Sequence, residues 1–110
     1  MALELVIGNK NYSSWSLRGW LVLELSGAAY TETLVPLFKP DTHAQLLAHS
    51  PAGKVPVLKT DEAGVIWDSL AIAEYLAEQF PAAHMWPQDL AARAMARSVC
   101  AEMHSGFTAL

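Results

Sequence analysis

The chain has 110 residues, of which 53% are hydrophobic and 16% charged, so it can bury enough apolar surface for one domain and is not expected to be disordered. Its formal net charge of −4 and its scattered Lys and Arg residues argue against a nucleic-acid partner. The single Cys100 excludes an internal disulfide, and because we find neither an export signal nor a membrane-length apolar run, we expect a cytoplasmic protein without a membrane partner.

Alternating patterns along the first eighty residues predict a mixed domain of strands and helices. Apolar β-prone runs that end at Gly, Pro or polar residues indicate strands, and apolar residues spaced by three or four indicate helices. In chain order we expect a strand at 3–7, a helix at 16–26, a strand at 30–36, a helix at 42–48, strands at 55–59 and 65–67, and a helix at 69–80. Thr42 and Gln45 have the spacing of a capping box at the second helix. This order predicts an α/β fold of β-α-β-α-β-β-α type.

The last thirty residues have a different pattern. Residues 81–88 contain prolines at both 81 and 87 without any periodicity, so we expect a linker. In residues 89–110, apolar residues recur every four positions from Met95 to Phe107 and predict an amphipathic helix. Because this apolar stripe continues almost to the last residue, we expect a missing continuation of the chain or a partner chain to cover it.

The polar segment between the first strand and the first helix is the strongest candidate for chemistry. Ser13 and Ser16 have the spacing of the cysteine pair that redox proteins of thioredoxin type carry here, so dithiol chemistry is excluded. A hydroxyl at a helix start can instead donate to the thiolate of a bound thiol, which would lower its pKa from roughly 8.5 to about 7. Ser is also a common N-cap. The adjacent Ser13 and Ser14 would allow one hydroxyl to cap the helix while the other faces a ligand.

Two further segments suit a peptide-like ligand. Pro56 opens an apolar strand, so it must lie at an edge, at a first position or in a cis bond, and a cis bond would turn the Val55 backbone toward an extended ligand. Asp68 and Ser69 precede a helical pattern. They are either ordinary N-caps, or Ser69 and its amide hold a carboxylate while Asp68 faces an ammonium group.

Other residues with reactive or aromatic side chains are assigned to structure. The four His residues lie on different expected elements without a ligand spacing, so no metal site is expected. Cys100 is expected to be a small buried hydrophobe in the last helix. Trp20 and Trp67 are expected in the core.

The three segments, in this order and at these distances, resemble the cytosolic glutathione S-transferases. The resemblance covers about the first eighty residues. It implies a thioredoxin-like, glutathione-binding domain at residues 1–80, a linker at 81–88, and the first helix of a truncated, all-helical C-terminal domain at 89–110. The family also implies a homodimer.

The resemblance implies a role for each site residue. Ser13, with Ser14 as its rival, would be the catalytic residue that activates the thiol of glutathione. The residues implied in glutathione binding are Trp15, Lys39, Lys54, Val55, Pro56, Asp68 and Ser69. Among them, Val55 would pair with the cysteinyl part before a cis Pro56, Asp68 and Ser69 would hold the γ-glutamyl end, and the two lysines would assist at the glycyl carboxylate.

The function implied is that of a glutathione transferase, which uses glutathione as co-substrate to conjugate or isomerise a small electrophile. The segment from Ser13 to Arg18 is most similar to the zeta-type enzymes, which include maleylacetoacetate isomerases, although these typically carry Cys where this chain has Trp15. Two alternatives stay open: a non-catalytic interaction module on the same fold, and a thioredoxin-like redox domain. The missing cysteine pair opposes the second alternative.

Overall fold

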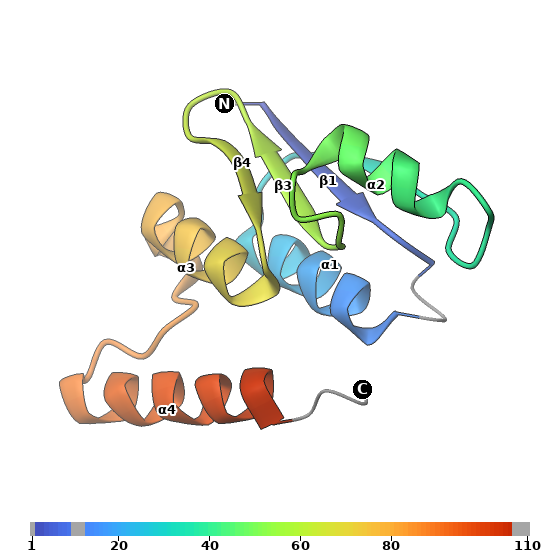
Figure 1. The fold of residues 1–110 in the computed structure, drawn as a ribbon. Helices are drawn as coiled ribbons and strands as arrows, with labels where there is room; N and C mark the ends of the chain where they lie inside the picture. Colours follow the sequence, from blue (N-terminus) through green and yellow to red (C-terminus); the bar gives the residue numbers. More distant parts are fainter. Residues whose placement is uncertain (1, 10–12, 107–110) are drawn as a thin grey trace.

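The computed structural model describes residues 2–9 and 13–106, and its elements follow the expected order (Figure 1). The strands are β1 (Leu3–Ile7), β2 (Thr31–Leu34), β3 (Val57–Thr60) and β4 (Gly64–Trp67). The helices are α1 (Ser14–Ser26), α2 (Thr42–His49), α3 (Ser69–Gln79), the short 3-10 helix η1 (Pro81–Ala83) and α4 (Leu90–Gly106). The predicted β-α-β-α-β-β-α order is confirmed, with boundaries that differ by a few residues.

The four strands form one sheet in the order β2-β1-β3-β4. Strand β1 is parallel to β2 and antiparallel to β3, where Leu5 is paired with Leu58, and β3 is antiparallel to β4. Because neighbouring antiparallel strands bring the end of one beside the start of the next, the ends of β1 and β4 meet the start of β3. The three loops attached there therefore share one edge of the sheet.

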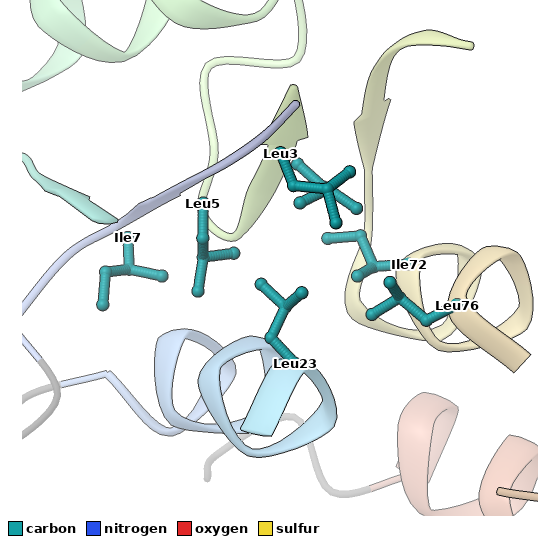
Figure 2. Close-up of a cluster of buried hydrophobic side chains, with 7 residues drawn as sticks. Leu3, Leu5, Ile7, Leu23, Ile72 and Leu76 are labelled. Atoms are coloured by element: carbon teal, nitrogen blue, oxygen red, sulfur yellow. The ribbon is translucent and has the colours of Figure 1, made fainter. Parts of the chain in front are cut away.

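Each face of the sheet carries its own apolar cluster. Leu3, Leu5 and Ile7 alternate along β1 and pack with residues from α1 and α3, and Figure 2 shows Leu5, Leu23 and Ile72 pointing toward one another. Val6 points to the opposite face, as alternation along a strand requires, and packs beneath α2. The sheet is thus held between α1 and α3 on one side and α2 on the other (Figure 1).

Helix α1 contacts the sheet mainly through small residues. Its buried residues are Ser16, Gly19, Leu23 and Ser26. Of the apolar residues whose spacing indicates this helix in the sequence, Trp20 packs against the core, whereas Leu17, Leu21 and Leu25 are 37%, 44% and 71% exposed. A Cβ added at Gly19 would lie 2.7 Å from the Cβ of Pro56. The small side chains of this face therefore let α1 approach the start of β3 closely.

The capping box expected at the second helix is wrong. Asp41 is the N-cap residue of α2, and the side chain of Gln45 donates to the Asp41 carboxylate. The hydroxyl of Thr42 is engaged elsewhere, because it donates to the carbonyl of Pro36 at 2.7 Å and accepts from the N–H of Lys39 at 3.0 Å. Thr42 thus closes the loop before α2 instead of capping the helix.

Helix α4 lies beside α3, and none of its residues is buried (Figure 1). The guanidinium of Arg97 lies 3.2 Å from the carboxylate of Glu74, and Nε2 of His104 lies 2.8 Å from Oδ1 of Asp68. His104 comes after Arg97 in the chain, whereas its partner Asp68 comes before Glu74. The two helices therefore run in opposite directions.

The apolar stripe expected on the last helix faces outward. Met95, Val99 and Met103 are 66%, 56% and 37% exposed, and Phe107 lies outside the described residues. Cys100 is only partly buried, so its expected burial is not complete. Within residues 2–9 and 13–106, we find no helix with the length and apolar character needed to pass through a bilayer.

Candidate functional site

A cleft of about 920 Å³ lies where the three loops meet at one edge of the sheet. Its walls come from the start of α1, the segment between α2 and β3, the junction of β4 with α3, and α4. The lining residues are Ser13, Trp15, Leu46, Ala52, Gly53, Lys54, Val55, Pro56, Trp67, Asp68, Ser69 and His104. The strand order explains this assembly, because it joins segments that are distant in the sequence.

Most of the residues singled out in the sequence line this cleft. Those that the structure brings together are Ser13, Trp15, Lys54, Val55, Pro56, Asp68 and Ser69. Ser14 and Lys39 are not among the lining residues. Lys39 is exposed on the loop before α2, and the Ser14 hydroxyl is buried without a hydrogen-bond partner in the part of the chain that the structure describes.

Ser13 combines the two roles that the sequence left open between neighbouring serines. Its Oγ accepts a hydrogen bond from the N–H of Ser16 at 3.1 Å, which makes it the side-chain N-cap of α1. A hydroxyl that accepts through a lone pair keeps its own proton to donate. The side chain that caps α1 can therefore still donate a hydrogen bond into the cleft.

Ser16 has a structural role. It is completely buried, and its Oγ accepts from the N–H of Gly8 at 2.9 Å. This bond ties the first turn of α1 to the end of β1. At the place where redox proteins of this shape carry their second cysteine, the chain thus uses a hydroxyl to fix the loop.

The segment before β3 presents backbone to the cleft. The peptide bond between Val55 and Pro56 is cis, as the resemblance implied. Ladder pairing of β3 with β1 begins at Val57. Within the described residues, the backbone N–H and C=O of Val55 take part in no backbone hydrogen bond. These groups are therefore available to a ligand that lies along the strand.

The start of α3 differs from the start of α1. Asp68 has a φ of 80° and a ψ of 127°, a backbone conformation that is strained for a residue with a side chain, and it forms no side-chain cap. Its carboxylate instead reaches His104, while Ser69 is only 6% exposed. Because the first N–H groups of a helix lack partners within the helix, an uncapped helix start suits a carboxylate.

Aromatic rings form one wall of the cleft. The Trp15 ring lies 4.1 Å from the guanidinium carbon of Arg18, and its centroid lies 5.1 Å from that of the His104 ring in an edge-on contact. The expectation that Trp67 is a core residue is wrong, because it is 52% exposed and lines the cleft. Its neighbour Ile66 packs against the core, so alternation along β4 turns Trp67 to the opposite face. Trp20 does pack against the core.

Sequence reasoning missed His104, which brings α4 into the cleft. A usable signal was present in the charges. Arg97 and His104 are seven residues apart on one helical face, and Glu74 and Asp68 are six residues apart on the preceding helix. Across the described residues, no group of three or more His, Cys, Asp or Glu side chains is placed to hold a metal ion.

Comparisons with known proteins find related sequences and related folds. The glutathione S-transferase N-terminal domain family matches residues 12–79. The probable maleylacetoacetate isomerase of Caenorhabditis elegans is 36% identical over 97 residues, which cover 88% of this chain and 44% of the relative. The chain spans less than half the length of such curated relatives.

Solved structures of proteins with bound glutathione have the same fold. The theta class glutathione S-transferase of Xanthomonas axonopodis pv. citri is 34% identical, with a TM-score of 0.77, and the match covers 98% of this chain and 51% of that protein. A glutathione transferase homologue from Burkholderia is 30% identical with a TM-score of 0.80, over 98% of this chain and 57% of that protein.

Proposed function

Since this chain belongs to the glutathione S-transferase family and matches its N-terminal domain, we propose that the cleft binds glutathione and forms the glutathione site of a transferase or isomerase. The observation that carries the proposal is that Ser13, Val55 and the Asp68–Ser69 pair line one cleft. These are the groups needed for a thiol, a peptide backbone and an amino-acid end, respectively. Relatives with glutathione bound support the same assignment.

Glutathione would lie along the start of β3. The backbone of Val55 would pair with its cysteinyl part, as an added strand pairs with a sheet edge. The γ-glutamyl carboxylate would approach the uncapped start of α3 at Ser69, and its ammonium group would face Asp68. Lys54 lines the cleft and is better positioned than Lys39 for the glycyl carboxylate.

Ser13 would activate the thiol. Its oxygen accepts from the Ser16 N–H, so its proton is free to donate to a thiolate beside the positive end of α1. A hydrogen bond to a charged group stabilises by about 1.5–3 kcal/mol and the helix end by about 0.3–1 kcal/mol, which together favour the ionised thiol near neutral pH. Ser14 is the weaker candidate, because its hydroxyl is buried and Ser14 is not one of the residues that line the cleft.

The electrophile would be bound with the help of a second domain. We assign residues 1–80 to the glutathione-binding domain, 81–88 to a linker and 89–110 to the start of a helical domain. The exposed apolar residues of α1 and α4 and the greater length of the relatives support this division. The relatives named as isomerases favour a small electrophile such as maleylacetoacetate, and a homodimer is proposed from the family alone.

The proposal is tested by following the ultraviolet absorbance of the bound glutathione thiolate against pH, with binding measured by calorimetry. We expect the wild-type protein to bind glutathione with a thiol pKa lowered to about 7. Ser13→Ala should return that pKa toward roughly 8.5, whereas Ser13→Thr, which keeps the hydroxyl, should not. An unchanged thiol pKa in Ser13→Ala would refute the serine mechanism. Absence of binding by the wild type would favour a non-catalytic interaction module.

A further inference from the structure

The imidazole of His104 joins three parts of the cleft wall. Its Nε2 lies 2.8 Å from Oδ1 of Asp68, and its Nδ1 lies 3.5 Å from Oγ of Ser69. Its ring also meets Trp15 edge-on at 5.1 Å between centroids. A side chain of α4 therefore touches the starts of both helices that form the cleft.

The two ring contacts define what His104 does to its neighbours. A carboxylate only accepts hydrogen bonds, so the proton at Nε2 is donated to Asp68, and in the neutral ring Nδ1 is left as an acceptor for the Ser69 hydroxyl. The side chain of Asp68 is 46% exposed and forms no cap on its own helix. Among the described residues, only His104 holds this carboxylate in one rotamer.

We propose that His104 is a positioning residue for the amino-acid end of the ligand, acting through Asp68 and Ser69. This inference rests on the proposed binding of glutathione, whose γ-glutamyl group carries an ammonium and a carboxylate. With Oδ1 held by His104, the second oxygen of Asp68 is directed to the ammonium group, and the Ser69 hydroxyl is kept beside the helix start. Recognition of the γ-glutamyl end is thus coupled to the position of α4.

A second contact between the same helices provides a matched control. Arg97 pairs with Glu74 at 3.2 Å, but neither residue lines the cleft. Arg97→Ala removes a polar contact between α3 and α4 and leaves the cleft residues in place. If His104 served only to hold α4 against α3, the two substitutions would have similar effects.

The test compares glutathione with glutaryl-cysteinylglycine, the analogue without the γ-glutamyl ammonium group, by calorimetric titration of the full chain. We expect His104→Ala to weaken glutathione binding about tenfold and the analogue by less than about threefold, because the analogue does not use Asp68. His104→Gln, which keeps a donor, should recover most of the loss. Arg97→Ala should change either affinity by less than about twofold.

Two results would overturn the inference while leaving glutathione binding intact. One is an equal loss for both ligands in His104→Ala, and the other is a loss that Arg97→Ala reproduces. A ligand-free measurement separates the inference from the proposed function: ¹⁵N spectra of the neutral His104 ring should show the proton at Nε2, and a proton at Nδ1 would refute the arrangement. If the wild type binds no glutathione, both the proposed function and this inference fail.

Discussion

The sheet with α1, α2 and α3 is held together differently from α4. In the first region, side chains such as Leu5, Leu58 and Ile72 are completely buried, whereas α4 has no buried residue. Helix α4 is attached instead by two polar contacts, one between Arg97 and Glu74 and one between His104 and Asp68. The side chains in both contacts are partly exposed. Most of the cleft is therefore supported by buried apolar packing. The wall formed by α4 is held by partly exposed polar contacts, with which water can compete.

The sharpest test of this difference is a truncation in each region. Ile72→Ala should lower the free energy of unfolding by about 2–5 kcal/mol, because it removes a fully buried side chain and leaves a cavity. Val99→Ala on α4, where the side chain is 56% exposed, should change it by less than about 0.5 kcal/mol. Urea unfolding followed by circular dichroism measures both values. Comparable losses would mean that α4 belongs to the same core.

Gly19→Ala tests the close approach of α1 to the cleft. In an open helix this change would stabilise by about 0.5–1 kcal/mol, but the new Cβ would lie 2.7 Å from Pro56. Overpacking against a rigid ring costs about 1–3 kcal/mol, so we expect a net loss of about 1 kcal/mol, and at most about 2.5 kcal/mol, in unfolding free energy. Weaker glutathione binding should accompany it, because Val55 must shift with Pro56.

The control for this substitution lies on α4. No atom of the described residues lies within 4 Å of a Cβ added at Gly106, so Gly106→Ala should be neutral or stabilising by up to about 1 kcal/mol. If Gly19→Ala were also stabilising, the tight contact between α1 and Pro56 would be refuted.

Arg97→Ala should have only a small effect on stability. The ion pair with Glu74 joins side chains that are 47% and 39% exposed, and such pairs contribute about 0–1 kcal/mol. The guanidinium also lies 5.1 Å from the Trp86 ring, a contact of similarly modest strength. We expect a loss below about 1 kcal/mol that diminishes as salt is added. A loss insensitive to salt would contradict a solvent-exposed attachment.

The order of the elements could be predicted from the sequence because strand and helix patterns are local. The cleft residues near Ser13, Pro56 and Asp68 could be found as well, since each stands at a break in such a pattern. The packed face of α1 could not be predicted in this way. Apolar spacing pointed to Leu17, Trp20, Leu21 and Leu25, of which only Trp20 packs against the core. The buried face consists of Leu23 with Gly19 and two serines, and these small residues carry no hydrophobic signal.

His104 was missed for a related reason. Its partner Ser69 is separated from it by 35 positions, and the contact depends on how α4 is placed against α3. The sequence assigned no role to the four histidines, because their spacing along the chain is not that of metal ligands. Pairing the charges of two successive helices would have connected His104 with Asp68.

The antiparallel course of α3 and α4 connects the part of the cleft at Asp68 with the exposed side of α4. The outer side of α4 displays Met95, Val99 and Met103, while its inner side carries His104 to Asp68. A domain or chain that packed on that outer side would change the position of α4, and the His104 imidazole would move with it. Under the role that we propose for His104, substitutions on that outer side would change ligand selectivity without touching the sheet, the proline loop or the serine at the start of α1.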